Sequence, residues 1–110
     1  MSELVIEGFT ADGSHCSLSA LVPANLRYLE GHFEGDPIVP GIAQLVALVW
    51  DPARRAWPDL PAPRAITRLK FLDALRPGHE VRVLLERGPG RVDFEIRRGD
   101  TVATRGRLTF

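Results

Sequence analysis

In the second half of the chain, three successive segments show a period of two, in which every second residue falls on the same face. A period of two is typical of strands that are buried on one side only. The stretches 88–90 and 98–100 between these segments are short and contain glycine, so they suit hairpin turns and the whole predicts an antiparallel meander. The positions predicted to share one face are Val81, Val83 and Leu85; Val92, Phe94 and Ile96; and Val102, Thr104, Gly106, Leu108 and Phe110.

Three further strands are predicted ahead of the meander. Two short ones are expected at residues 4–9 and 16–22, around a turn at 12–13. A third is expected at residues 65–72, and the segment 76–78 ends it. The predicted sheet is therefore antiparallel throughout, with long strands in its second half.

One segment has a helical pattern instead. From residue 41 to about residue 56, apolar residues cover nearly the whole circumference of a helix, and such a helix must be buried. Pro52 should kink or break it, which limits the well-formed part to residues 41–51. We therefore expect one domain, residues 1–110, of the α+β class, in which a long antiparallel β-sheet wraps around one central buried α-helix.

Composition narrows the classes of function. Fourteen Lys and Arg against fourteen Asp and Glu argue against a nucleic-acid-coating protein, which needs an excess of basic charge. The longest nearly apolar run, residues 38–50, is shorter than the ~20 residues that span a bilayer, and no secretory signal precedes it. Cys16 is the only cysteine, so we expect no disulfide and no metal site. These features predict a soluble cytoplasmic protein, and its small size favours burial against a second subunit.

The most suggestive chemistry lies in the segment 31–45, a loop rich in glycine and proline that carries His32 and leads into the predicted helix. Such a loop can aim one side chain. The first-turn amides of Gly41 and Ile42 have no acceptor within the helix, so they can bind a carbonyl oxygen on which negative charge develops. The segment therefore combines a potential base with an oxyanion site.

This segment matches the pattern G-H-F-x-G-x-P-I/V-x-P-G-x-x-Q at every fixed position, and residues 70–78 match K-F-x-x-x-x-x-P-G. Through these residues the chain resembles the 3-hydroxyacyl-(acyl-carrier-protein) dehydratases of fatty acid synthesis and their hotdog-fold relatives in polyketide and aryl polyene pathways. The resemblance covers nearly the whole chain and implies a hotdog fold.

The resemblance also implies roles for individual residues. His32 would be the catalytic base, the Gly41 amide would receive the thioester carbonyl, and substrate would lie in a tunnel at a dimer interface. Gln44 matches a family position and could orient a water molecule, although a satisfied buried amide is an equal alternative. The substrate-binding residues expected around these groups are Phe33, Pro40, Ile42 and Val46.

One position departs from the family. The acid that protonates the leaving hydroxyl is usually a Glu or Asp fourteen residues after the histidine, contributed by the other subunit, and here that position is Val46. A loop carboxylate, Glu34 or Asp36, is one possible replacement. A second hotdog subunit that supplies the carboxylate in a heterodimer is another.

Three functions therefore remain open. The first is a hydro-lyase that converts 3-hydroxyacyl to trans-2-enoyl thioesters, impaired or not by Val46. The second is a non-catalytic acyl-thioester-binding protein or heterodimer subunit, and the third is a hotdog thioesterase, for which the sequence offers no convincing extra base. The resemblance implies a homodimer or heterodimer and no cofactor, because the phosphopantetheine of acyl carrier protein or coenzyme A carries the substrate.

Other polar residues have plainer interpretations. His15 and His79 are expected to be solvated, and Cys16 to be a small apolar residue of a strand. A basic cluster near the helix end is either a solvated face or a docking site for an acidic carrier protein. Its members are Arg54, Arg55, Arg64, Arg68, Lys70 and Arg76.

Overall fold

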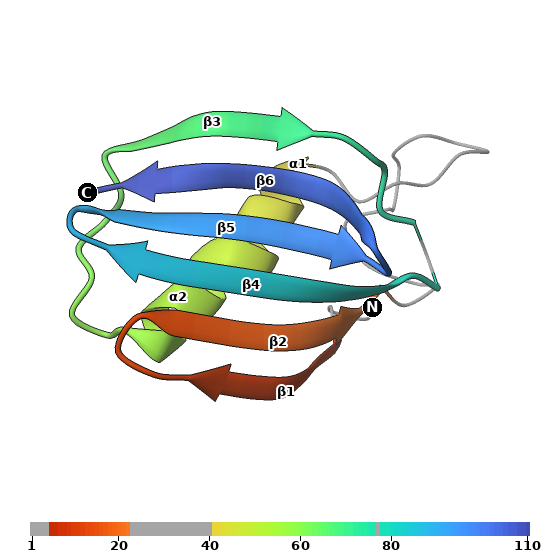
Figure 1. Ribbon diagram of the computed structural model, residues 1–110, viewed down its shortest axis with the longest axis horizontal. Coiled ribbons are helices and arrows are strands. Elements are labelled where there is room, and N and C mark those ends of the chain that lie inside the picture. The colour runs from red at the N-terminus through yellow and green to blue at the C-terminus, as the bar shows by residue number, and fades with distance from the viewer. Residues whose placement is uncertain (1–4, 23–40, 77) are drawn as a thin grey trace.

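The computed structural model describes residues 5–22, 41–76 and 78–110. One antiparallel sheet of six strands lies across a single helical rod (Figure 1), with the strand order β1-β2-β4-β5-β6-β3. The predicted long sheet around one buried helix is therefore confirmed. The strands are β1 (Val5–Ala11), β2 (His15–Leu21), β3 (Ala65–Phe71), β4 (Glu80–Gly88), β5 (Arg91–Arg98) and β6 (Thr101–Thr109).

The central strands follow the predicted alternation. Val81, Val83 and Leu85 of β4 are buried, and so are Val92, Phe94 and Ile96 of β5, while the residues between them are more exposed. The buried side chains cover Leu48, Val49 and Ala53 of the helical rod, which are themselves fully buried. Burial of this apolar surface is the main force that holds the helix against the sheet.

The helical rod runs past the predicted break at Pro52. It consists of α1 (Gly41–Gln44), a π-helical segment (Leu45–Trp50) and α2 (Asp51–Ala56). The Asp51 amide donates to the Val46 carbonyl five residues earlier, so the wider π turns lie directly before the proline. Pro52 then stands in the first turn of α2, where a missing N–H costs little. The prediction that the well-formed helix ends at residue 51 was therefore wrong.

A bulge interrupts β6 near its start. Thr104 lies opposite Ile96 and Val102 lies opposite Arg97, so Ala103 is an extra residue on β6. Ala103 and Thr104 are both buried, which breaks the strict alternation predicted from Val102 onward. The Ala103 carbonyl accepts the amides of Leu72 and Asp73, which join the end of β3 to this bulge. The bulge therefore sets how β3 and Thr104 face the helix.

Among the described residues, no helix is long and apolar enough to cross a membrane.

Candidate functional site

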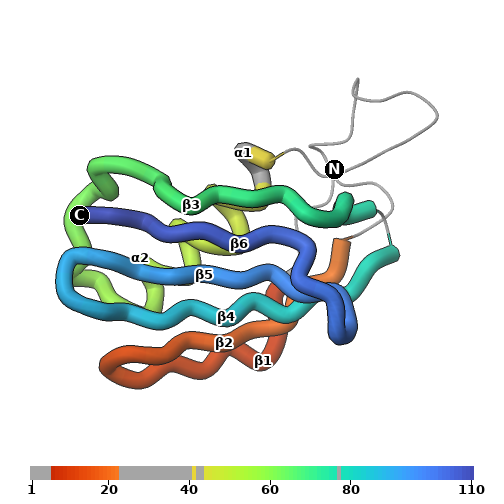
Figure 2. Tube along the Cα trace, turned by 45° about the horizontal axis from the view of Figure 1, so that its top comes forward, coloured from red at the N-terminus to blue at the C-terminus, as the bar shows by residue number. Residues whose placement is uncertain are grey.

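The helix start lies under the edge of the sheet formed by β3 and β6 (Figure 2). The Phe71 ring packs on Gly41 so closely that a Cβ at position 41 would lie 2.6 Å from the ring Cζ. Because glycine has no Cβ, only glycine permits this approach without displacing the ring. Phe71 itself is 50% exposed, so the ring covers the helix start from the solvent side.

A buried polar pair lies one helical turn further on. The Thr104 hydroxyl donates a hydrogen bond of 2.6 Å to Oε1 of Gln44, and these two side chains are 0% and 3% exposed. Thr104 is paired with Phe71 across the β3–β6 ladder. The two contacts from the sheet, Phe71 to Gly41 and Thr104 to Gln44, therefore come from neighbouring positions and reach the same face of the helix.

Val46 follows on the π-helical segment and is 40% exposed. The helical residues 41–50 contain no acidic or basic side chain. Leu72, at the end of β3, is 54% exposed. The position at which the resemblance implies a carboxylate is thus apolar and accessible in this chain.

Several predicted site residues fall outside the described part of the chain. These are His32, Phe33 and Pro40, together with the loop carboxylates Glu34 and Asp36. Ile42 belongs to α1 by its backbone, but its side chain is outside the description. Of the predicted set, the structure describes Gly41 and Gln44, which share a face of the helix, and Val46, which lies two residues further on and is exposed.

Sequence reasoning missed the contribution of Thr104. Its position on the inward face of β6 was predicted, but only as a strand residue. The signal was a hydroxyl in a row of otherwise apolar or small inward residues, since a buried hydroxyl needs a partner. That partner is Gln44, the one polar side chain among helical residues 41–50.

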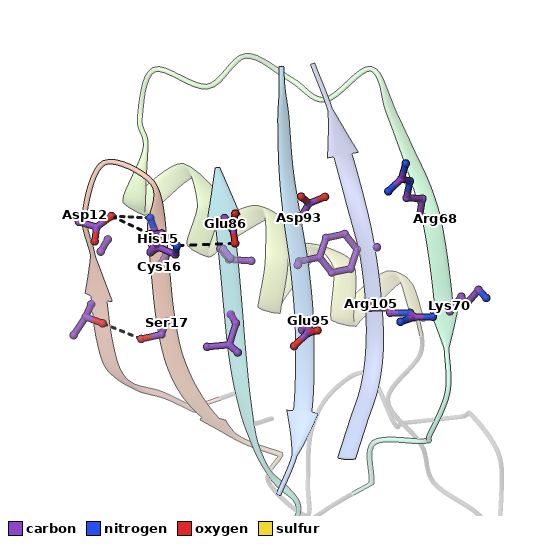
Figure 3. A pocket seen from close by; sticks show the side chains of 16 residues that line it. Asp12, His15, Cys16, Ser17, Arg68, Lys70, Glu86, Asp93, Glu95 and Arg105 are labelled. Carbon is purple, nitrogen blue, oxygen red and sulfur yellow. Dashed lines mark hydrogen bonds and ion pairs between the residues drawn. The ribbon is translucent and has the colours of Figure 1, made fainter. Parts of the chain in front are cut away.

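A large depression of about 940 Å³ lies elsewhere, over the face of the sheet turned away from the helix (Figure 3). Of the predicted site residues whose side chains the structure describes, Gly41, Gln44 and Val46, none lines it. Much of its polar lining is already engaged: His15 lies within 4.0 Å of both Asp12 and Glu86, and Asp93 binds two arginines. The depression therefore does not coincide with the helix start, where the sequence predicted the site.

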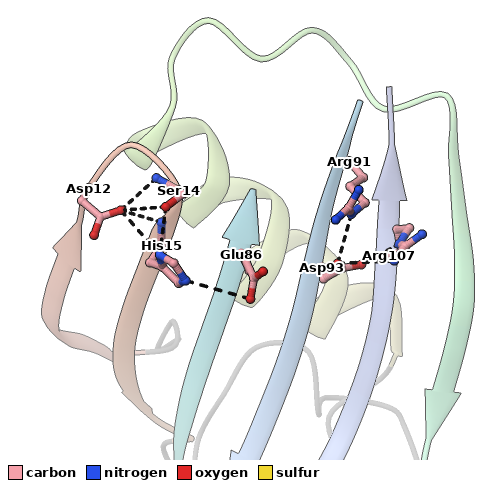
Figure 4. Close-up of polar contacts among 7 residues, drawn as sticks. All are labelled: Asp12, Ser14, His15, Glu86, Arg91, Asp93 and Arg107. Atoms are coloured by element: carbon pink, nitrogen blue, oxygen red, sulfur yellow. Dashed lines mark hydrogen bonds and ion pairs between the residues drawn. The ribbon is translucent and has the colours of Figure 1, made fainter. Parts of the chain in front are cut away.

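Two carboxylates on this side of the sheet, Asp12 and Asp93, accept hydrogen bonds that stabilise their charged form (Figure 4). Burial raises the pKa of Asp93, but hydrogen bonds and charge from Arg107 and Arg91 outweigh it, so its pKa lies below the usual value. The backbone amides of Ser14 and His15 lower the pKa of Asp12. Both groups thus act as fixed acceptors in turns and strands.

The predicted basic cluster does not form one surface. The Arg55 guanidinium lies 4.0 Å from the centre of the Phe9 ring on β1, whereas Arg68 and Lys70 lie on β3, at the opposite edge of the sheet. His79 also differs from its prediction as a solvated residue. It is half-buried, its Nδ1 accepts the Arg76 amide at 2.9 Å, and Arg98 lies 3.2 Å from its Nε2.

Comparison with known proteins places this geometry in a family. The model of the ApeI-like family, described as ApeI dehydratase, matches residues 9–107. Two proteins named 3-hydroxyacyl-[acyl-carrier-protein] dehydratase FabZ, from Alkaliphilus metalliredigens and Natranaerobius thermophilus, are each 31% identical over 100 residues. The match covers 81% of this chain, and 68% and 70% of theirs.

Solved structures agree on the hotdog fold. A chain of the dehydratase heterocomplex ApeI:P from Xenorhabdus doucetiae superimposes with a TM-score of 0.88 at 19% identity, over 98% of this chain and 97% of that one. The E. coli PaaI protein of phenylacetic acid degradation gives 0.64 at 18% identity, over 98% and 82%. An uncharacterised protein from Erwinia carotovora gives 0.72 at 28% identity, over 97% and 92%. The family match over residues 9–107 and the FabZ relatives together show that this chain belongs to the ApeI-like family of hotdog dehydratases.

Proposed function

We propose that this chain takes part in the dehydration of 3-hydroxyacyl thioesters to trans-2-enoyl thioesters, with His32 as the base. The dehydratase-like function itself follows from the family and the FabZ relatives. In the reaction, His32 removes the proton alpha to the thioester carbonyl, and the beta hydroxyl leaves as water after it gains a proton from an acid. The acyl chain is carried on the phosphopantetheine of acyl carrier protein or on coenzyme A, and the reaction needs no further cofactor.

The start of the helix supports a second catalytic role, the stabilisation of the thioester oxygen. The helical rod begins at Gly41, so the Gly41 amide belongs to the first turn and has no acceptor within the helix. An amide in that position can donate to the thioester oxygen as negative charge develops during proton removal. The predicted lining residues Phe33, Pro40, Ile42 and Val46 would surround the acyl chain beside it.

The observation that carries most weight is that Val46 on the helix and the edge strand β3 are both exposed. Every residue of β3 is exposed, and large apolar side chains stand on or next to it. Edge strands with such side chains are ready to pair with another subunit. These side chains are Ile66, Leu69, Phe71 and Leu72.

We propose that a second hotdog subunit covers this surface and brings a carboxylate to Val46. The Xenorhabdus relative, which belongs to a dehydratase heterocomplex, supports this arrangement by analogy. A homodimer would bury the same surface, but both copies carry valine at position 46. A heterodimer therefore supplies the acid that a homodimer lacks, so we propose that the heterodimer is the active form. A cytoplasmic location belongs to the proposal and agrees with the free thiol of Cys16.

The test is the hydration of a short 2-enoyl thioester, followed as loss of enoyl absorbance, with thiol release measured in the same samples. Wild type, His32→Ala and Val46→Glu are compared, each alone and with a carboxylate-bearing hotdog subunit from the same organism. His15→Ala, in an exposed strand position, is the matched control. We expect His32→Ala to abolish turnover and His15→Ala to preserve it.

The outcomes separate the alternatives. Activity that appears only with the second subunit, or in Val46→Glu alone, supports a dehydratase whose acid comes from outside this chain. Thiol release without enoyl hydration would instead identify a thioesterase. Tight thioester binding without turnover in every sample would leave a non-catalytic acyl-thioester-binding protein.

A further inference from the structure

The outer side of the β3 edge carries three positive charges. Arg68 and Lys70 of β3, together with Arg105 of the neighbouring β6, line the depression on the face of the sheet turned away from the helix (Figure 3). All three residues are exposed. Lys70 lies directly opposite Arg105 in the β3–β6 ladder, although like charges in such a pair repel each other. The edge strand and its neighbour therefore concentrate charge of one sign.

None of these three cations forms an ion pair within the part of the chain that the structure describes, although carboxylates lie nearby. Glu95 is paired with Arg105 across β5 and β6, but its carboxylate binds Arg97 at 2.9 Å. Asp93, the other acid of β5, binds Arg107 at 2.6 Å. The positive charge at the edge is therefore not neutralised within the chain. The remaining carboxylates of the depression lie within 4.0 Å of His15 and are Asp12 and Glu86.

The backbone of β3 is strained at the middle cation of the strand. Arg68 has a φ of 56°, the one positive value among the described non-glycine residues. It belongs to a bulge in which two residues, 68 and 69, lie opposite Gly106 alone. Bulges and charged side chains on an edge strand are means by which proteins oppose pairing with a wrong strand. β3 is thus built against indiscriminate pairing.

The helix side of the same edge is apolar and needs cover. Phe71 packs on Gly41 and still keeps 50% of its surface exposed, and Ile66 and Leu72 are 41% and 54% exposed. Such apolar side chains favour contact with another subunit. The partner that satisfies both sides of β3 covers the apolar side chains and brings negative charge to the cations.

A second copy of this chain would meet these cations with its own. When two β3 strands pair antiparallel around a two-fold axis normal to the sheet, each face continues on the same side of the joined sheet. Arg68 is the middle residue of β3, so full overlap places it opposite the same residue of the other copy. A shift of two residues places it opposite Lys70. Both registers set unneutralised cations against each other, which weakens self-association.

We propose that the outer side of β3 selects its partner by charge: Arg68, Lys70 and Arg105 disfavour a second copy of this chain and fit a hotdog subunit whose edge strand carries carboxylates on the same face. The inference rests on the second subunit of the proposed function and gives that subunit's chemistry. These carboxylates are distinct from the catalytic acid. They act on association, so their role is measured without turnover.

The experiment uses this chain with its edge charge reversed, Arg68→Glu/Lys70→Glu, as the acidic partner. Fluorescently labelled wild type is titrated with unlabelled wild type, with the reversed variant or with the control Arg54→Glu/Arg82→Glu, and anisotropy gives Kd. The control changes the net charge equally, at two exposed positions outside β3. Each titration is run at about 50 mM and about 500 mM NaCl. Lys70→Glu/Arg105→Glu is the second reversed variant if circular dichroism shows that the first is unfolded.

We expect the reversed variant to bind labelled wild type at least about 10-fold more tightly than wild type binds itself at low salt. The reversed variant should associate with itself as weakly as wild type does, since its acids then face one another. High salt should reduce the difference to about threefold or less, because it screens exposed charges. The control should stay within about threefold of wild type, because its substitutions lie outside the edge.

Three results would overturn the inference: equal affinity of wild type for itself and for the reversed variant, an equal gain with the control, or no mixed dimer at all. Binding of an acidic carrier protein through these cations without a mixed dimer would overturn it too, since the surface would then serve carrier docking. If enoyl hydration is absent in every assembly but the mixed dimer forms, the proposed function fails and the selection by charge stands.

Discussion

The centre of the sheet and its β3 edge are built on opposite principles. In β4 and β5, every second side chain is buried; Val83 and Ile96 are fully inaccessible. In β3 every residue is exposed, and Phe71 and Leu72 keep half of their surface in solvent. The centre is therefore complete within one chain, whereas the edge leaves apolar surface for another molecule to cover.

Charges differ between these regions in the same way. On the outer face of the centre, Asp93 binds Arg107 at 2.6 Å and Arg91 at 3.3 Å (Figure 4). Arg97 binds Glu95 at 2.9 Å on the same strand. Within the described part of the chain, neither Arg68 nor Lys70 of β3 forms an ion pair. The difference teaches that the central strands serve folding, while the edge strand leaves apolar and basic side chains exposed for contact with another molecule.

The largest expected contrast comes from one truncation in each region. Leu48→Ala empties a fully buried position and should destabilise the chain by about 2–5 kcal/mol. Leu72→Ala, at a 54% exposed position, should change stability by less than about 0.5 kcal/mol in the separate chain. Urea unfolding at one fixed protein concentration measures both. Equal losses would show that β3 is already covered in the sample, for example by a second copy.

Two glycines, one in each region, test the same contrast, because a phenylalanine ring packs equally closely on both. A Cβ at Gly106 or at Gly41 would lie 2.6 Å from the Cζ of a phenylalanine ring, Phe94 or Phe71. Phe94 is 2% exposed and cannot move, so Gly106→Ala should cost about 1–3 kcal/mol. Phe71 is 50% exposed and can swing outward, so Gly41→Ala should cost less than about 1 kcal/mol.

Activity sharpens this second comparison. Gly41→Ala should lower the rate of enoyl hydration, because the methyl group displaces the Phe71 ring that covers the helix start. Thermal unfolding and initial rates are measured together. A strongly destabilised Gly41→Ala variant would mean that the Phe71 ring is held as firmly as that of Phe94.

A smaller effect is expected at His79, where the end of β2 meets the turn before β4. Burial and the charge of Arg98 lower the pKa of this imidazole below 6.5. The unfolded chain then binds the proton more tightly, so the stability that neutral His79 contributes is lost as pH falls below about 6.5. When the pH is lowered from about 7.5 to about 5.5, we expect Tm to fall less in His79→Gln than in wild type. A Tm change that is identical in the two proteins would contradict this assignment.

The smallest effect is expected at Asp93. Its pKa lies below the usual 3.8, so the paired carboxylate stabilises the fold above that value, and this stabilisation is lost as pH falls through the lower folded-state pKa. The side chain is 37% exposed, and solvent screening should keep the contribution under about 1 kcal/mol. Urea unfolding of Asp93→Asn near neutral pH should show this loss. Asp100→Asn, in an exposed turn, serves as the control, and equal stability of the two variants would refute the role of the pair.

The sequence by itself determined the features that depend on local geometry. The order of residues shows the period of two in β4 and β5, the helix that is apolar around nearly its whole circumference, and the turns that contain Gly90 and Gly99. Both turn glycines adopt positive φ, at 68° and 60°, which other residues rarely do. The motif around His32 and the departure at Val46 were equally visible, because they lie in one continuous stretch.

Only the tertiary structure decided the features that join distant segments. The Ala103 bulge, the packing of Phe71 on Gly41 and the bond from Thr104 to Gln44 each depend on how strands register and where the helix lies against them. The helix likewise continues through Pro52 because π turns and burial against the sheet accommodate the proline. Local propensity cannot specify such pairings, since the same residues in another register would face the opposite side of the sheet.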